Sequence, residues 1–128
     1  MKEIVLIDSH GWIEYFSDGP KASKYAQYIE PANIESHIIP SIVLYEVYKK
    51  IKSSVGEAPA LEAIAHMIEH TNLVSIDKSI ALNAAEISLK HKLAMADSLI
   101  MATANSLRAK LVTGDLHFKG LPNVIFIE

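Results

Sequence analysis

The chain has 128 residues, of which 50% are hydrophobic and 21% are charged, a size and composition typical of one folded globular domain. It contains no cysteine, which excludes disulfide frameworks, thiolate metal sites and cysteine nucleophiles and is compatible with a reducing cytoplasm. The net charge of −3 argues against binding of nucleic acid through a basic surface alone. The first apolar run ends at Asp8 and is too short for a signal peptide or a membrane span. We therefore expect residues 1–128 to form a single cytoplasmic domain with no membrane partner.

The first third of the chain predicts one strand followed by two helices. Glu3–Ile7 is apolar after its first residue, as expected of a strand that is buried on both faces of a parallel sheet. A helix over Ser9–Phe16 ends at the Ser-Asp-Gly-Pro sequence of residues 17–20, which disfavours helix. A second helix over Lys21–Ile29 stops before Pro31.

The middle of the chain repeats this order of elements. His37–Ile39 is a short predicted strand, and a helix then begins at Pro40 and continues to about Lys52. Ser41 is the predicted N-cap of that helix, because its hydroxyl can accept a hydrogen bond from a free backbone amide. Another helix is predicted over Pro59–His70, where apolar residues recur at helical spacing.

The last part of the chain alternates strands and helices once more. The remaining predicted elements are the strand Leu73–Ile76, the helix Lys78–His91 capped by Asp77, the helix Ala96–Leu107, and the strands Lys110–Thr113 and Val124–Ile127. Because helices separate nearly all the strands, the sequence predicts a three-layer α/β/α fold with a mainly parallel central sheet.

Two aspartates follow predicted strands, at the edge of a parallel sheet where ligands usually bind. Asp8 comes directly after the first strand, and Asp115 comes two residues after Thr113, which ends the fourth. Each has a simpler explanation, since Asp8 could cap the next helix and Asp115 could stabilise a turn. Asp77 occupies a comparable position, and nothing about it exceeds capping.

Two further acidic residues lie in or beside apolar helices. Glu46 is surrounded in sequence by apolar residues, so it could point into a pocket or form an exposed i,i+4 pair with Lys50. Asp97 opens an apolar helix, where it could be an N-cap or a ligand. Unpaired carboxylates are costly to bury, so if these acids meet, we expect a divalent cation with oxygen ligands between them.

Four motifs in chain order resemble those of PIN-domain ribonucleases, and the resemblance covers essentially the whole chain. The matching segments are the apolar strand before Asp8-Ser9 with Trp12-Ile13, the segment Pro40–Glu46, the segment Ala96–Ala104, the segment Leu111–Phe118, and the closing strand Asn123–Phe126. The size of the chain is most similar to that of the toxin in VapBC-type toxin–antitoxin pairs.

This resemblance implies a metal-dependent endoribonuclease that uses Mg²⁺ or Mn²⁺ to hydrolyse RNA. It implies that Asp8, Glu46, Asp97 and Asp115 are the metal-binding and catalytic acids, with hydroxyls of two neighbours, Ser9 and Thr113, in support. It also implies a small antitoxin that binds a hydrophobic groove and blocks the site, and a homodimer. Aromatic residues of the early helices could serve either interface or the core; they are Trp12, Tyr15, Phe16, Tyr25 and Tyr28.

Other interpretations remain open at the level of sequence. The acids could be caps and surface pairs of a catalytically silent interaction module, or part of a Mg²⁺-binding phosphoacceptor signalling domain. Residues 66–70 spell H-x-x-E-H, an inverted zinc-protease motif, although the predicted helix ends there. His10 and His117 lie beside proposed site residues and could contact the substrate or only the surface. Lysines such as Lys49 and Lys50 keep a nucleic-acid substrate possible.

Overall fold

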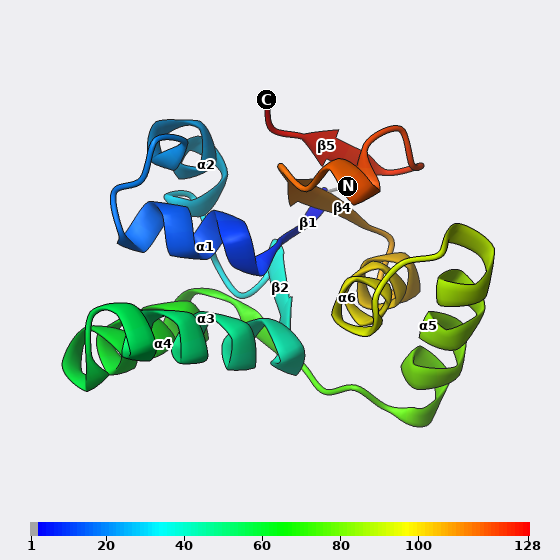
Figure 1. The fold of residues 1–128 in the computed structure, drawn as a ribbon, viewed down its shortest axis with the longest axis horizontal. Helices are drawn as coiled ribbons and strands as arrows, with labels where there is room; N and C mark the ends of the chain where they lie inside the picture. The colour runs from blue at the N-terminus through cyan, green and yellow to red at the C-terminus, as the bar shows by residue number, and fades with distance from the viewer. Residues whose placement is uncertain (1–2) are drawn as a thin grey trace.

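The computed structural model describes residues 3–128, and its strands form one five-stranded sheet in the order β3-β2-β1-β4-β5 (Figure 1). All four pairs of neighbouring strands are parallel. The strands are β1 (Ile4–Ile7), β2 (His37–Pro40), β3 (Asn72–Val74), β4 (Ala109–Thr113) and β5 (Val124–Phe126).

Helices cover both sides of this sheet. They are α1 (Ser9–Phe16), α2 (Ala22–Ile29), α3 (Ser41–Ser54), α4 (Glu57–His70), α5 (Lys78–His91), α6 (Met95–Ser106) and the 3₁₀ helix η1 (Leu116–Phe118). In Figure 1, α1 to α4 lie to the left of the strands and α5 and α6 lie to the right. The predicted three-layer α/β/α fold with a parallel sheet is confirmed.

The two central strands form the most deeply buried part of the core. In the register of β1 and β4, Leu6 lies opposite Leu111 and Ile7 opposite Val112, and all four side chains are at most 1% exposed. Layers of helices on both faces bury these strands, which explains their mostly apolar sequences. The same register aligns the carboxyl ends of β1 and β4.

Element boundaries differ from the predictions at a few places. Ser41 is not an N-cap, because the extended residue before α3 is Pro40, which makes no side-chain capping bond. The strand β3 ends at Val74 rather than Ile76, because the chain must already turn toward α5. Asp77 caps α5 as predicted, with its carboxylate accepting a hydrogen bond from the backbone nitrogen of Ile80 at 2.8 Å.

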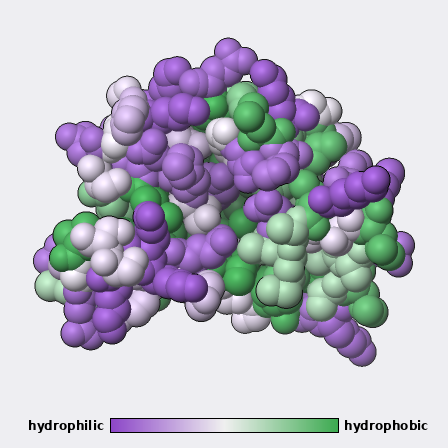
Figure 2. All heavy atoms as spheres, in the orientation of Figure 1, coloured by the Kyte–Doolittle hydropathy of each residue, from purple (hydrophilic) through white to green (hydrophobic). Residues whose placement is uncertain are grey.

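The surface is unevenly hydrophobic. Figure 2 shows hydrophobic residues gathered at the lower right, over α5 and α6. Of the aromatic residues considered for either an interface or the core, Trp12 and Tyr25 are at most 1% exposed and belong to the core. No helix within residues 3–128 is both long enough and apolar enough to cross a membrane.

Candidate metal centre

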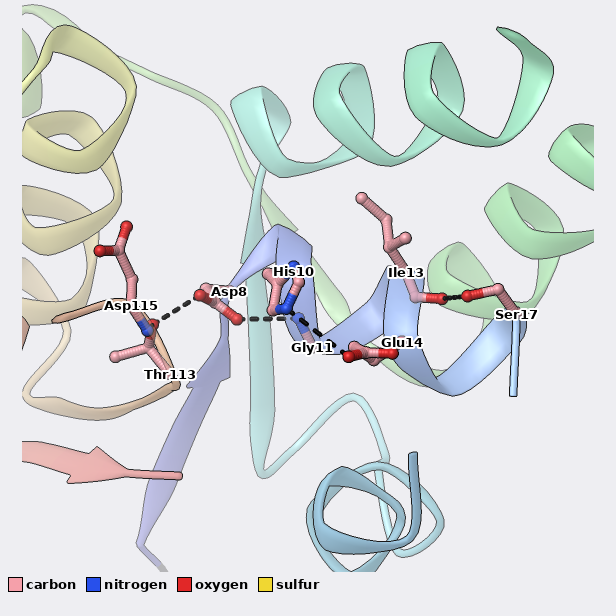
Figure 3. A network of polar contacts seen from close by, with 8 residues as sticks. All are labelled: Asp8, His10, Gly11, Ile13, Glu14, Ser17, Thr113 and Asp115. Carbon is pink, nitrogen blue, oxygen red and sulfur yellow. Dashed lines mark hydrogen bonds and ion pairs between the residues drawn. The ribbon is translucent and has the colours of Figure 1, made fainter. Parts of the chain in front are cut away.

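The carboxyl ends of β1 and β4 bring Asp8, Thr113 and Asp115 together (Figure 3). The hydroxyl of Thr113 donates a hydrogen bond of 2.5 Å to Asp8 Oδ2 and accepts one of 3.1 Å from the backbone nitrogen of Asp115. Thr113 is fully buried, so this hydroxyl has a fixed position. The threonine predicted as a supporting residue therefore joins the two aspartates.

Asp8 both caps a helix and faces the site. Its Oδ1 accepts a hydrogen bond of 2.9 Å from the backbone nitrogen of Gly11, while Oδ2 binds Thr113. The residue is only 4% exposed, and burial raises the pKa of Asp8 to about 6, against the lowering effect of the bonds from Thr113 and Gly11. Capping and a site role are thus not exclusive alternatives here.

Asp97 reaches the same region from the other side of the sheet. It lies in the first turn of α6, whose N-cap is Ala94, so its interpretation as an N-cap is wrong. Burial raises the pKa of Asp97, and the charges of Asp115 and Glu46 raise it further, whereas His117 lowers it. Each of these charged groups therefore lies near enough to Asp97 to act on its carboxylate.

Glu46 enters the region from α3 and leaves one oxygen without a partner. Its Oε1 is buried and makes no hydrogen bond within residues 3–128. Within the same residues, the alternative ion pair with Lys50 does not form. A buried carboxylate oxygen without a partner is costly, and a cation is the simplest group that would satisfy it.

A group of potential metal ligands contains a histidine that was not predicted to be a ligand. Ligand atoms of Asp97, Asp115 and His117 all lie within 4.8 Å of one another. Asp115 accepts a hydrogen bond from the backbone nitrogen of His117 at 2.9 Å and lies 2.8 Å from its ring Nδ1. The only sequence signal was the position of His117 two residues after an aspartate, in reach of a turn.

Ser9 borders a cavity beside this group of acids. The cavity has a volume of about 620 Å³ and lies between α1 and α3, where Ser9 and Glu46 are both part of its wall. Ser9 is partly exposed at the start of α1. It is not part of the Asp8–Thr113–Asp115 network, and its supporting role stays a prediction.

The arrangement fits a divalent cation. Most of the donors are carboxylate oxygens, which are ordinary ligands of Mg²⁺ and Mn²⁺, and one is an imidazole nitrogen. Glu46 Oε1 has no protein partner among residues 3–128, and the charge of Asp115 raises the pKa of both Asp8 and Asp97. A bound cation would relieve this mutual repulsion.

The H-x-x-E-H motif does not form a comparable group. The rings of His66 and His70 lie 4.3 Å apart on α4, but within residues 3–128 the potential metal ligands that cluster are Asp97, Asp115 and His117. The structure therefore gives no support to a zinc site on α4.

His10, considered above as a substrate contact or a surface residue, lies 3.8 Å from the carboxylate of Glu14.

The chain thus has the arrangement of α/β proteins that bind a ligand at the carboxyl edge of a parallel sheet. Here that edge carries acidic residues that could hold a metal ion. The family model of the PIN domain matches residues 5–123, and the chain belongs to the PIN domain family. Comparison with curated proteins found no match. The family match leaves the phosphoacceptor interpretation without support.

Solved structures with the same fold include several toxin–antitoxin proteins. A toxin–antitoxin complex from Klebsiella pneumoniae is 27% identical, with a TM-score of 0.77 over 94% of this chain and 95% of that one. VapBC2 from Rickettsia felis, bound to a promoter DNA fragment, is 18% identical with a TM-score of 0.73 over 97% of both chains. VapC20 from Mycobacterium tuberculosis, described as a toxin that cleaves the sarcin–ricin loop, is 12% identical with a TM-score of 0.71 over 83% and 85%.

Proposed function

We propose that this chain is a metal-dependent endoribonuclease and the toxin of a toxin–antitoxin pair, acting as one domain in the cytoplasm. The observations that carry the proposal are that Thr113 joins Asp8 to Asp115 and that ligand atoms of Asp115 and Asp97 lie within 4.8 Å of each other. The charge of Glu46 also acts on Asp97. Similarity to toxin–antitoxin structures, one described as cleaving the sarcin–ricin loop, supports the choice of RNA.

The proposed reaction is hydrolysis of a phosphodiester bond. A bound Mg²⁺ or Mn²⁺ would supply charge compensation at the phosphate and a more acidic water. Asp8, Glu46, Asp97 and Asp115 would hold the cation, with Asp8 fixed by its bonds from Thr113 and Gly11. The net charge of the chain is −3, which would repel a phosphate. A cation held by the acids would offset this charge locally and allow the phosphate to bind.

The cavity between α1 and α3 offers a path for the RNA strand next to these acids. Tyr45, Lys49 and Lys50 form part of its wall, and the Tyr45 side chain is 57% exposed. Lys49 Nζ lies 5.6 Å from the Tyr45 ring centroid, so a cation and an aromatic face are presented together. Such pairs bind single-stranded nucleic acid through phosphate contacts and base stacking.

The site is tested by cleavage of a pool of structured RNAs with Mg²⁺, Mn²⁺ or a chelator. We expect cleavage that requires metal and is lost in Asp97→Asn. Asp77→Asn is a matched control, because Asp77 also caps a helix after a strand but lies in another part of the fold, before α5. Equal cleavage by Asp97→Asn and the unchanged protein would refute the proposal.

The path is tested by RNA binding at several salt concentrations. Removal of one lysine that binds a phosphate should reduce the slope of log K against log salt by about 0.7 for a single strand. We expect this reduction for Lys49→Gln and for Lys50→Gln, but not for Lys90→Gln, an exposed residue of α5. Identical slopes for all three variants would remove this surface from the substrate path without affecting the metal site.

An apolar groove offers a docking place for the antitoxin. It has a volume of about 390 Å³ and is walled by residues that include Tyr15, Phe16, Ile51 and Val55. Val55 is 66% exposed, and an apolar helix of the antitoxin would cover it. This assignment uses two of the early aromatic residues considered for this role.

The antitoxin prediction is tested by co-expression of the chain with a candidate antitoxin. Val55→Asp should abolish co-purification, whereas Leu89→Asp on α5, where the parent side chain is 77% exposed, should not. Co-purification that is insensitive to Val55→Asp would place the antitoxin elsewhere.

We also propose a homodimer through α5. Leu82 and Leu89 are 69% and 77% exposed and lie seven residues apart, so they share one face of the helix. The hydrophobic region at the lower right of Figure 2 lies over the same helix. Sedimentation should show a dimer that dissociates in Leu82→Lys/Leu89→Lys and persists in Val55→Asp.

A further inference from the structure

We infer that His117 is a direct nitrogen ligand of the cation held by Asp97 and Asp115, so that this site takes a transition-metal dication such as Mn²⁺ in preference to Mg²⁺. The inference rests on the proposed metal-dependent function and adds a residue outside the four acids. It concerns the identity of one ligand and the choice of metal.

The spacing of the donor atoms is compatible with ligands of a single ion. An octahedral ion with bonds of about 2.1 Å places adjacent ligands roughly 3 Å apart and opposite ligands roughly 4.2 Å apart. Asp115 Oδ1 and His117 Nδ1 form an ion pair at 2.8 Å, close to the adjacent separation, so a cation that displaced the Nδ1 proton to solvent could bind both atoms with little movement of either. All three ligand atoms, including that of Asp97, lie within 4.8 Å of one another, which accommodates both separations.

The backbone on both sides of His117 holds this residue in place. Its backbone nitrogen donates to Asp115 Oδ1 at 2.9 Å, which fixes the start of η1. The next residue, Phe118, is 1% exposed and anchors the end of the same short helix in the core. His117 therefore lies between two fixed points, with its ring directed to Asp115 although its side chain is 74% exposed.

Glu46 offers a further oxygen donor near Asp97. Glu46 Oε1 is buried and makes no hydrogen bond within residues 3–128, and the charge of Glu46 acts on Asp97. A centre with carboxylates and one imidazole suits first-row transition ions, whereas Mg²⁺ prefers oxygen ligands and water. The donor set thus favours Mn²⁺ over Mg²⁺.

The test uses Mn²⁺ alone as the probe, bound stoichiometrically to the full chain and examined by pulsed electron paramagnetic resonance. A coordinated imidazole gives ¹⁴N modulation, which carboxylates and water do not. We expect this modulation in the unchanged protein and its loss in His117→Gln, with an approximately tenfold or greater loss of Mn²⁺ affinity and a smaller change in Mg²⁺ affinity. His10→Gln is the matched control, because His10 is exposed and lies two residues after Asp8, as His117 lies two residues after Asp115, and it should retain the modulation.

The possible outcomes separate this inference from the proposed function. Bound Mn²⁺ without ¹⁴N modulation, or modulation that persists in His117→Gln, overturns the inference while metal-dependent cleavage can still stand. Absence of Mn²⁺ binding together with absence of cleavage overturns both. Because the His117 side chain is exposed, His117→Gln should keep the parent melting temperature without metal, and this measurement shows that a lost signal is not caused by misfolding.

Discussion

Removal of the charge of Asp8 should stabilise the protein when no metal is bound. Asp8 is 4% exposed, and burial raises its pKa from 3.8 to about 6. At about 1.4 kcal/mol for each tenfold change in proton affinity, this shift corresponds to about 3 kcal/mol. The folded chain therefore holds the Asp8 proton more tightly than the unfolded chain.

The sign of the pH dependence follows from this difference. The protonated side chain stabilises the fold below about pH 4, and this contribution is lost as the pH rises through the folded-state pKa of about 6. Asp8→Asn removes the charge but weakens the bond from Thr113, which costs about 1 kcal/mol. The net gain in the free energy of unfolding should be about 2 kcal/mol at pH 7.5 and near zero at pH 4.5.

Urea denaturation at both pH values, with a chelator present, measures this gain. Asp77→Asn is the control, because asparagine is an equally good N-cap and Asp77 is exposed. We expect that control to change the free energy of unfolding by less than about 0.5 kcal/mol at either pH. If Asp8→Asn were less stable than the parent at pH 7.5, or equally shifted at both pH values, the argument from burial would be wrong.

Three further changes test other parts of the site. Gly11→Ala should lower the free energy of unfolding by about 1–3 kcal/mol, because the Cβ of the new alanine would lie 2.6 Å from Tyr25 Cε1. An unchanged urea midpoint would contradict this. Thr113→Val should reduce cleavage about tenfold or more, because the hydroxyl that orients Asp8 is lost, and Thr113→Ser should largely restore the rate; cleavage by the valine variant at the parent rate would show that this bond does not matter. Phe118→Ala should cost about 3–5 kcal/mol in the free energy of unfolding, because Phe118 is 1% exposed; calorimetry measures the loss, and a value below about 1 kcal/mol would mean that the ring is not a core anchor.

The sheet could be predicted from sequence because its strands carry a local signal. Ile4–Ile7 is apolar and Ala109–Thr113 is largely apolar; both are short and followed by an acidic residue within two positions. That pattern is typical of central parallel strands, and it also places Asp8 and Asp115 at the same edge of the sheet. Ser41 shows the limit of local signals, because the extended Pro40 before it already occupies the cap position.

The ligands on helices could not be placed in the same way. Glu46 has apolar neighbours on most sides of α3, so periodicity does not tell which face meets the site; only the packing of α3 against α1, α4 and α6 decides this. His117 was considered a substrate contact or a surface residue, because its position depends on the turn that Asp115 caps and on the anchoring of Phe118. These are tertiary properties that spacing does not encode.

The topology explains why a centre of this kind also influences stability. Asp8 and Asp115 follow central strands, Glu46 comes from α3 on one side of the sheet, and Asp97 comes from α6 on the other (Figure 1). Without a cation, burial raises the pKa of Asp8 and Asp97; the charge of Asp115 raises both further, and that of Glu46 raises the pKa of Asp97. The layers are therefore joined by groups that repel one another. A cation would convert this repulsion into a link among all three layers, and binding to the folded state alone would stabilise the fold by mass action. The metal should therefore raise the melting temperature of the parent chain more than that of Asp8→Asn, because the variant has lost both the repulsion and a ligand.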